Sequence, residues 1–206
     1  MKTIELFCGT KSFSKVMAAN GHETFTVDID GLFGPDLCMD IHQMHHSDLP
    51  YVPDILWASP PCTTFSVASI GTHWTGGKGA YIPRTQEAKD GIRLVEQTRA
   101  IIKELEPRWW FIENPRGVLR KLPVMDGLRR VTVTYCQYGD DRMKPTDIWT
   151  NAHWWQQRPV CKNGDPCHQR APRGAKTGTQ GLAGAKERGV IPPALFEEIL
   201  SQAPKK

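Results

Sequence analysis

The sequence has no long hydrophobic run, and this absence excludes a membrane-spanning helix. Its first residues also lack the apolar stretch and the small-residue cleavage site of a secretory signal peptide, so we expect a cytoplasmic protein. Excess charge is scarce too, because 26 Lys and Arg stand against 22 Asp and Glu. The resulting net charge of +4 is too small to indicate a nucleic-acid partner by itself.

The six cysteines are scattered and lack the spacing of a disulfide framework. In a cytoplasmic chain we interpret them as free thiols, metal ligands or a nucleophile. With 206 residues, the chain is long enough for one domain whose core needs no covalent cross-links. The 18 glycines and 16 prolines exceed their usual share and predict many turns and ordered loops.

Short apolar runs alternate with helical patterns along most of the chain. Strands are predicted at residues 3–7, 24–27, 54–58, 109–112, 131–135 and 147–150, and helices at residues 12–20, 85–106 and 193–202. This alternation predicts an α/β fold with a mostly parallel sheet and helices on both faces. Ligands of such sheets bind at the carboxyl ends of the strands, where the glycine, proline and acidic residues of this sequence gather.

The composition changes after Asn151. Residues 152–189 contain seven Lys and Arg against two acids, so this segment, with a charge of +5, accounts for the whole positive surplus. It is rich in glycine and has little apolar periodicity, which predicts a loop-dominated insert. We therefore divide the chain into a core at residues 1–151, a short basic insert at 152–189 and a closing segment at 190–206.

Cys62 follows a predicted strand and two prolines, which hold its backbone stiffly at the ligand-binding edge of the sheet. A rigid thiol at a strand end suits a nucleophile, provided that its surroundings help it to ionise. Glu113 follows the strand at 109–112 and is predicted to project from the same edge. A carboxyl group beside such a thiol suits a general acid. Taken alone, each residue also fits a structural role in a turn.

The first strand leads through Gly9 into a helix, an entry typical of nucleotide-binding folds because a glycine lets a ligand approach the backbone. Asp28 ends the second strand, where a carboxylate suits the hydroxyl pair of a ribose. The turn lacks the GxGxxG motif, which argues against a nicotinamide-dependent dehydrogenase.

In their order along the chain, the motifs at the predicted strand ends resemble those of the DNA cytosine C5 methyltransferases. The motifs are Glu5-Leu6-Phe7-Cys8-Gly9, Val27-Asp28-Ile29-Asp30, Met39-Asp40-Ile41, Ser59-Pro60-Pro61-Cys62, Glu113-Asn114-Pro115 and Gln137-Tyr138-Gly139. The strongest match is Pro-Pro-Cys-x-x-Phe-Ser, with Leu-Phe-Cys-Gly upstream and Glu-Asn-Pro downstream. The resemblance covers residues 1 to about 151 and resumes at Val190-Ile191-Pro192-Pro193.

The resemblance implies a Rossmann-like sheet of the S-adenosylmethionine-dependent methyltransferase type, and methyl transfer to carbon 5 of cytosine in double-stranded DNA. It implies that Cys62 adds to carbon 6 of a flipped-out base and that Glu113 protonates N3. Arg142 and Lys144 are expected to hold the base or a phosphate. The residues implied to surround S-adenosylmethionine are Phe7, Gly9, Asp28, Ile29, Asp40, Ile41, Pro61 and Val190. Those implied to contact DNA are Ser66, Asn114, Gln137, Tyr138, Gly139, Arg158, Arg173 and Lys176.

The sequence departs from the family pattern in two places. Lys11-Ser12 stands where the family usually has two more glycines, so this turn is expected to be less open to the cofactor or differently shaped. The usual recognition region is reduced to residues 152–189, whose cations, with Trp154 and Trp155, are expected to hold phosphate and stack on a base. So short a region predicts a short recognition site or low specificity. The glycine-rich stretch at 63–84 is predicted to be a mobile lid over the DNA.

Zinc ligands are available in the insert, but His153, Cys161, Cys167 and His168 are spaced too widely to secure a set of four, and no metal is predicted. A monomer without membrane partners is expected. Two other functions stay open: the same chemistry on tRNA or with a variant cofactor, and an inactive DNA-binding or regulatory relative. The presence of both Cys62 and Glu113 counts against the inactive relative.

Overall fold

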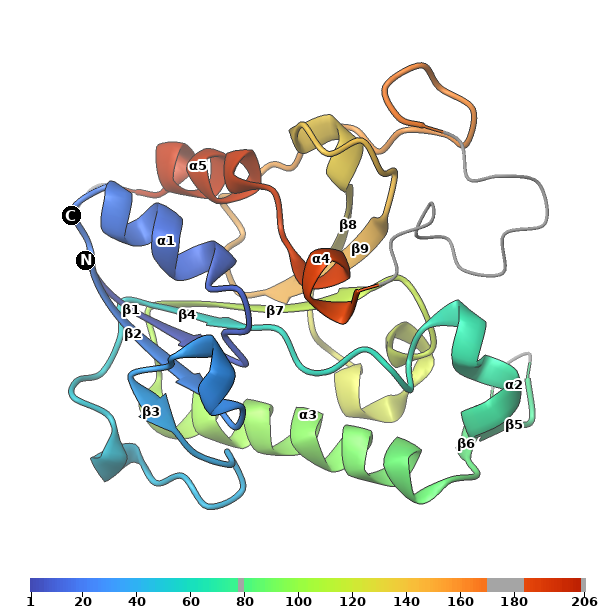
Figure 1. Ribbon diagram of the computed structural model, residues 1–206, viewed down its shortest axis with the longest axis horizontal. Helices are drawn as coiled ribbons and strands as arrows, with labels where there is room; N and C mark the ends of the chain where they lie inside the picture. Colours follow the sequence, from blue (N-terminus) through green and yellow to red (C-terminus); the bar gives the residue numbers. More distant parts are fainter. Residues whose placement is uncertain (78–79, 170–183, 205–206) are drawn as a thin grey trace.

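The computed structural model describes residues 1–77, 80–169 and 184–204, apart from the side chains of Ala185 and Lys186. Its centre is a seven-stranded sheet in the order β3-β2-β1-β4-β7-β9-β8 (Figure 1). The strands are β1 (Lys2–Leu6), β2 (Glu23–Asp28), β3 (Leu37–Cys38), β4 (Ile55–Ala58), β7 (Trp109–Pro115), β8 (Arg130–Thr134) and β9 (Pro145–Thr150). Neighbouring strands from β3 to β7 pair in parallel, whereas β9 is antiparallel to both β7 and β8. The predicted α/β fold with a mostly parallel sheet is confirmed.

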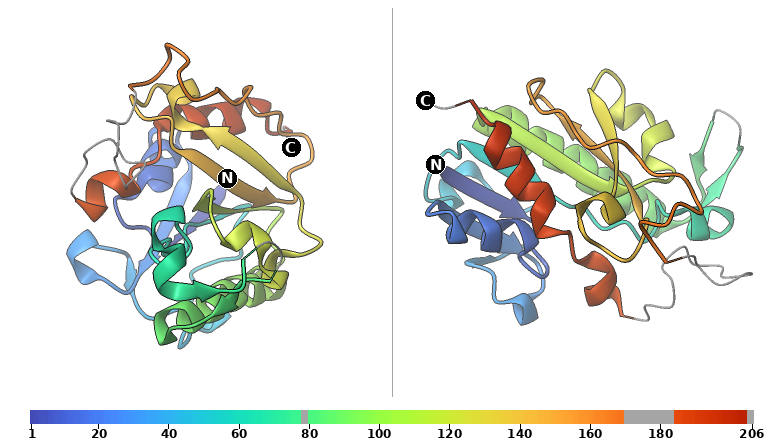
Figure 2. Two further views of the ribbon diagram at one scale, coloured as in Figure 1. Left: turned by 90° about the vertical axis from the view of Figure 1, so that its right-hand side faces the viewer. Right: turned by 90° about the horizontal axis from the view of Figure 1, so that it is seen from above.

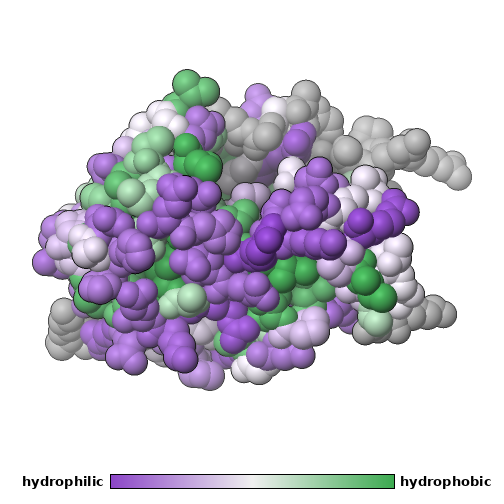
Figure 3. All heavy atoms as spheres, turned by 90° about the horizontal axis from the view of Figure 1, so that it is seen from below, coloured by the Kyte–Doolittle hydropathy of each residue, from purple (hydrophilic) through white to green (hydrophobic). Residues whose placement is uncertain are grey.

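Helices cover both faces of the sheet. Helices α1 (Ser12–Ala19) and α5 (Pro193–Gln202) lie on one face, and α3 (Gln86–Leu105) lies on the other (Figures 1 and 2). Thr85 caps the amino end of α3, and its hydroxyl accepts a hydrogen bond from the Ala88 N–H (3.3 Å). The face of the molecule on the α3 side is largely hydrophilic (Figure 3). Within the described ranges, no helix has both the length and the hydrophobicity to span a membrane.

Each face of the sheet has its own hydrophobic core. In the core toward α3, Leu6 of β1 and Leu56 of β4 are fully buried. Toward α1 and α5, Trp57 stacks on Phe13 (5.6 Å between ring centroids) and meets Phe196 edge-on (4.8 Å). Each such buried side chain stabilises the fold by about 1.5–3 kcal/mol. The two cores hold the carboxyl ends of β1, β4 and β7 in fixed relative positions.

The structure also contains short elements that the sequence pattern does not predict. Among them are β3, α2 (Ile70–His73), the hairpin of β5 (Trp74–Thr75) with β6 (Ile82–Pro83), α4 (Ala185–Gly189) and the 3-10 turn η6 (Tyr135–Tyr138). With two to five residues each, they are too short for hydrophobic periodicity to reveal.

The beginning of the insert belongs to the core, which differs from the expectation that its tryptophans stack on DNA. Trp155 is fully buried, packs edge-on against Phe111 (6.0 Å) and donates from Nε1 to Oε1 of Glu198 (3.2 Å). Trp154 packs edge-on against Trp109 (5.1 Å), at the amino end of β7 and therefore away from the predicted site. Burial of large rings between sheet and helix stabilises the fold, so these side chains serve packing.

Candidate active site

The carboxyl ends of β4 and β7 place the two predicted catalytic motifs side by side. The strands pair in parallel with Ala58 opposite Ile112, so the residues that follow leave the same edge of the sheet. The side-chain Nδ2 of Asn114 donates a hydrogen bond to the Pro60 carbonyl (2.9 Å) and so joins the two motifs. Asn114 is fully buried, and this bond helps to hold the loop in place, while its contact with DNA stays a prediction.

Cys62 is half-buried in a tight turn. Its carbonyl accepts hydrogen bonds from the N–H groups of Phe65 (3.1 Å) and Ser66 (3.0 Å), which fix the backbone that carries the thiol. Burial raises the pKa of the Cys62 thiol, and the Glu113 carboxylate raises it further. The Lys144 ammonium acts in the opposite direction and favours the thiolate.

Glu113 is buried next to Cys62. Its Oε1 accepts a hydrogen bond from the Tyr135 hydroxyl (2.9 Å), a partner that the sequence did not indicate. Burial raises the pKa of the Glu113 carboxyl, and the Lys144 charge limits the increase. A carboxyl group in this state keeps its proton closer to neutral pH than an exposed glutamate does, as a general acid requires.

Lys144 completes the group of charged side chains. Its Nζ donates to the Arg188 carbonyl (2.7 Å) and lies 4.6 Å from the centre of the Tyr135 ring. Burial lowers the pKa of Lys144, and the Glu113 carboxylate opposes that decrease. The structure therefore brings Glu113 to the same edge as Cys62, as expected, and adds Lys144, whose charge acts on both. The predicted contact of Lys144 with the base or a phosphate stays a prediction.

Arg142 differs from its predicted contact with the base or a phosphate. Its guanidinium forms a bidentate ion pair with Asp140 (2.5 Å from Nη2 to Oδ2), and only 8% of the residue is exposed. Its Nη1 donates to the Glu187 carbonyl (3.4 Å) at α4. Because Asp140 neutralises its charge, Arg142 here ties the segment before β9 to α4.

A cavity of about 490 Å³ opens at the carboxyl ends of β1 and β2. Six of the residues predicted to surround S-adenosylmethionine line it: Phe7, Asp28, Ile29, Asp40, Ile41 and Pro61. Gly9 lies next to it and donates its N–H to Oδ2 of Asp28 (2.8 Å). Val190 is not among the lining residues. Pro61 joins the cavity to the turn that carries Cys62, so the cavity and the thiol are neighbours.

Five residues that line the cavity were not among those predicted to surround S-adenosylmethionine: Met39, His42, Asp90, Arg93 and Leu94. Of these, Met39 belongs to a motif that carries the family resemblance, and the others do not. Three of them belong to α3, whose sequence pattern marks the face packed on the sheet but not the side turned toward the cavity. The sequence around His42 predicts only an exposed turn, which the structure shows. Only the tertiary arrangement places these side chains at the site.

The turn after β1 is tight although it lacks the additional glycines. Phe7 and Lys11 both have φ 56°, in the left-handed region that costs a non-glycine residue about 1 kcal/mol or more. The Lys11 N–H donates to the Cys8 carbonyl (2.6 Å), and its ammonium donates to the Gly34 carbonyl. Lys11 thus adopts a backbone conformation that glycine normally supplies, and it is not among the residues that line the cavity.

The residues predicted to contact DNA fall into different environments. Tyr138 is buried and donates its hydroxyl to Oε1 of Glu198 (2.9 Å), so it packs α5 instead of facing a substrate. Arg158 forms an ion pair with the same carboxylate group (2.8 Å) and lies over the Tyr138 ring (4.7 Å). Its charge is therefore already partnered.

Of the remaining residues predicted to contact DNA, Ser66 and Gln137 are half-buried and Gly139 is exposed. Ser66 shares a hydroxyl hydrogen bond with Ser69 (3.0 Å), and Gln137 and Gly139 belong to the turn at η6. For Ser66, Gln137 and Gly139 the contact stays a prediction. Arg173 and Lys176 lie outside the described residues.

The parallel α/β sheet, the cavity at its carboxyl edge and the adjoining cysteine and carboxyl group define a Rossmann-like methyltransferase. Residues 1–123 match the family model of the C-5 cytosine-specific DNA methylases. This match spans more than half of the chain, which therefore belongs to this family of DNA (cytosine-5-)-methyltransferases.

One curated protein and two solved structures are similar to the chain. The chain is 29% identical over 215 residues to a protein of Frog virus 3 (isolate Goorha) described as a probable DNA (cytosine-5)-methyltransferase, and the match covers 97% of this chain and 99% of that one. A crystal structure of an E. coli prophage protein, described as a DNA modification methyltransferase, is similar in fold, with a TM-score of 0.50 at 15% identity over 78% of this chain and 52% of that one. S. pombe Dnmt2 methyltransferase gives a TM-score of 0.48 at 13% identity, over 73% of this chain and 48% of that one. The chain thus spans about half the length of these two solved structures.

Gly117 allows the chain after β7 to cross the loop that carries Cys62. A Cβ at Gly117 would lie 2.1 Å from the Phe65 carbonyl oxygen, an atom that accepts a hydrogen bond from the Val118 N–H (2.8 Å). We expect Gly117→Ala to displace this loop, lowering the free energy of unfolding by about 1–3 kcal/mol. Methylation should slow by about tenfold or more, because misplaced reacting groups lose their alignment.

Urea denaturation and initial methylation rates measure the two effects of Gly117→Ala. The matched control for the stability measurement is Gly71→Ala, since no atom outside its chain neighbours and helix backbone lies within 4 Å of a Cβ there. Equal stability of the two variants, with a wild-type methylation rate for Gly117→Ala, would contradict the close approach at Gly117.

Proposed function

We propose that this protein methylates carbon 5 of cytosine in double-stranded DNA, with S-adenosylmethionine as cofactor and a covalent bond between Cys62 and carbon 6 of the base. The observation that carries the proposal is the cluster of Cys62, Glu113 and Lys144 beside the cavity, to which Pro61 connects it. Family membership supports the choice of reaction.

The residues of the cluster match the needs of this chemistry. Carbon 5 of cytosine is a poor nucleophile until a thiolate adds to carbon 6, which places electron density on carbon 5. Cys62 supplies the thiolate, and Glu113 donates a proton to N3 to neutralise the charge that this addition creates. S-adenosylmethionine, when bound, would supply the methyl group that carbon 5 attacks, and S-adenosylhomocysteine would be the leaving group. A base would then take the carbon 5 proton, N3 would return its proton to Glu113, and the Cys62 thiolate would leave, which restores the aromatic ring.

Lys144 adjusts the ionisation of both reacting groups. Its charge favours the Cys62 thiolate, while the Glu113 charge disfavours it. Protonated Glu113 would remove that repulsion, so the pair favours a thiolate together with a neutral acid. This is the combination that addition at carbon 6 and protonation at N3 require.

The cavity provides suitable groups for S-adenosylmethionine, which supplies an electrophilic methyl group when bound. Asp28 already accepts the N–H groups of Gly9 (2.8 Å) and Asp30 (2.9 Å), one on each oxygen, and its remaining lone pairs suit the ribose hydroxyls. Apolar side chains such as Phe7, Ile29 and Leu94 suit the adenine ring.

A cytosine in a duplex hides the ring face that the thiol attacks, so the base must leave the stack at a cost of a few kcal/mol. The stretch at 63–84 adjoins Cys62 and is the proposed lid over such a base. Within the described part of this stretch, the Trp74 indole N–H donates to the Thr64 carbonyl (2.7 Å), which ties residues 64 and 74 together. The mobility of the stretch stays a prediction.

Asp28→Asn tests the cofactor site. The substitution keeps the size of the side chain but loses the charge and one acceptor, so the dissociation constant for S-adenosylmethionine should rise about tenfold or more. Isothermal titration calorimetry measures it, with Asp30→Asn as the control because Asp30 is not among the cavity-lining residues. Equal affinities for the two variants would remove Asp28 from the site.

The experiment that tests the proposed function is product analysis. Purified protein is incubated with S-adenosylmethionine and either plasmid DNA or tRNA, and the nucleosides are separated by mass spectrometry. We expect 5-methyldeoxycytidine from DNA, and bisulfite sequencing should place it in a short or loosely defined sequence context. Methylation of tRNA alone would favour the RNA enzyme, and no product from either would favour an inactive relative. Action as a monomer in the cytoplasm remains part of the proposal.

A further inference from the structure

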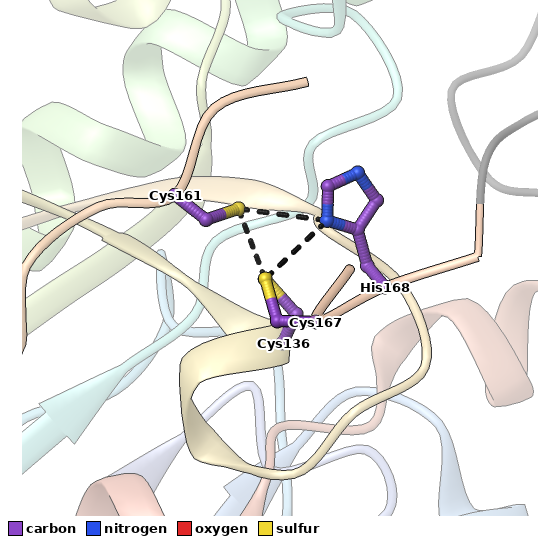
Figure 4. A group of neighbouring side chains, drawn as sticks. All are labelled: Cys136, Cys161, Cys167 and His168. Carbon is purple, nitrogen blue, oxygen red and sulfur yellow. Dashed lines mark hydrogen bonds between the residues drawn. The ribbon is translucent and has the colours of Figure 1, made fainter. Parts of the chain in front are cut away.

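Three cysteines and one histidine converge next to the active site. They are Cys136 in η6 and Cys161, Cys167 and His168 in the insert, and their side chains point toward one another (Figure 4). The three Sγ atoms and a ring nitrogen of His168 all lie within 4.8 Å of one another. Cys136 and Cys161 are buried, whereas Cys167 is exposed.

We propose that these four side chains bind a structural zinc ion. Three thiolates and one imidazole form one of the common tetrahedral ligand sets for zinc. With Zn–S bonds of about 2.3 Å and a Zn–N bond of about 2.0 Å, a tetrahedral ion places two sulfurs about 3.8 Å apart and a sulfur and a nitrogen about 3.5 Å apart.

The observed separations are close to those values. Sγ of Cys167 lies 3.7 Å from Sγ of Cys136 and 3.6 Å from Nδ1 of His168. Sγ of Cys161 lies 3.7 Å from the same Nδ1. Cys136 and Cys161 are closer, at 3.1 Å between sulfurs, and a small rotation of either side chain opens this pair to the tetrahedral distance.

A disulfide is the competing chemistry for this cluster. The 3.1 Å between the sulfurs of Cys136 and Cys161 is well beyond a disulfide bond of about 2.05 Å. A disulfide between Cys136 and Cys161 would also not explain why Cys167 and His168 lie beside the same two sulfurs. Zinc uses all four groups, so it accounts for the convergence better.

The surrounding backbone and side chains support a bound thiolate cluster. Nε2 of Gln137 donates to Sγ of Cys167 (3.4 Å), and the Cys161 N–H donates to Oγ1 of Thr134 (3.1 Å). The Gln169 N–H donates to the Asp141 carbonyl (2.9 Å). Bonds of this kind hold the ligands in place around a metal.

The ion would join the insert to the catalytic edge of the sheet. Cys136 directly follows Tyr135, whose hydroxyl donates to Glu113. The other ligands come from residues 161–168, a part of the insert that, unlike Trp154 and Trp155, has no large apolar side chain to pack. Zinc therefore supplies the cross-link that a small loop-rich segment needs, and it stiffens the support of the general acid. Cys136 lies 25 residues before Cys161, which is why spacing within the insert does not reveal the fourth ligand.

The test begins with metal analysis of full-length protein purified with a reductant and without chelator. Inductively coupled plasma mass spectrometry should find about one zinc per chain, and removal with a chelator should lower the melting temperature by about 5 °C or more. Cobalt added to the stripped protein should produce thiolate-to-metal charge transfer and the intense visible bands of tetrahedral coordination.

The ligand variant is Cys167→Ser, chosen because this exposed side chain contributes little to packing. It should weaken zinc binding by about 100-fold or more, while Cys38→Ser, an exposed cysteine outside the cluster, should keep wild-type affinity. The proposal is overturned if the reduced wild-type protein neither contains nor binds zinc, if both variants bind equally, or if Cys136 and Cys161 form a disulfide after purification.

Discussion

Cys62→Ala is expected to abolish methylation while leaving the fold and the affinity for S-adenosylmethionine intact. In the proposed mechanism the thiol adds to carbon 6, and no other cysteine among the described residues lies in this turn. Alanine removes one sulfur atom from a half-buried position and breaks neither hydrogen bond of the Cys62 carbonyl. Loss of a catalytic nucleophile commonly lowers turnover by about four orders of magnitude or more.

Initial rates of methyl incorporation into DNA, with calorimetric titration of the cofactor, separate the two properties. Cys38→Ser is the matched control because Cys38 is exposed on β3, away from the cluster of Cys62 and Glu113. We expect the control to keep wild-type rates. A Cys62→Ala protein with more than about a hundredth of wild-type activity would show that another group attacks the base.

Glu113→Gln is expected to slow methylation by about 10²–10⁴-fold, because glutamine cannot transfer a proton to N3. Glutamine keeps the shape of the side chain and can still accept a hydrogen bond from Tyr135. Initial rates under saturating cofactor measure the effect. Near wild-type rates would mean that Glu113 is a structural residue only.

The same variant should be more stable than the wild type above neutral pH. The folded-state pKa of Glu113 is raised by burial, so the folded protein holds this proton at pH values where the unfolded chain has lost it. Ionisation of Glu113 therefore destabilises the fold progressively as pH rises from the ordinary carboxyl pKa through the raised one. Glutamine does not ionise and avoids that loss.

Urea denaturation from about pH 5 to about pH 8 measures this linkage. The stability of Glu113→Gln relative to the wild type should increase across that range. A difference that stays constant with pH would contradict the raised pKa. A gain in stability with a loss of activity would mark Glu113 as a residue kept for its chemistry.

Much of the site could be predicted from sequence because its residues directly follow strands. Asp28, Cys62 and Glu113 each lie at or just past a short apolar run, and parallel pairing brings such positions to one edge of the sheet. The turn at Gly9 follows the same rule. The local sequence therefore identifies these reactive side chains and also the edge of the sheet where they lie.

The rest depends on tertiary contacts that local sequence does not record. Arg142 is a residue type that commonly binds phosphate, but its guanidinium forms an ion pair with Asp140 of the same turn. Trp155 has the composition of a stacking platform, but α5 packs over it. The side of α3 that lines the cavity follows from how its buried face is seated on the sheet, which periodicity alone does not define.

The central claim is that Cys62 forms a covalent bond with the target base, and trapping that bond tests it most directly. A duplex containing 5-fluorocytosine is incubated with the protein and S-adenosylmethionine, because fluorine at carbon 5 cannot leave as a proton and the adduct persists. The complex is then digested and the modified peptide is sequenced by mass spectrometry. The account predicts a single adduct on the peptide that contains Cys62. An adduct on another cysteine, or active methylation without any adduct, would contradict it.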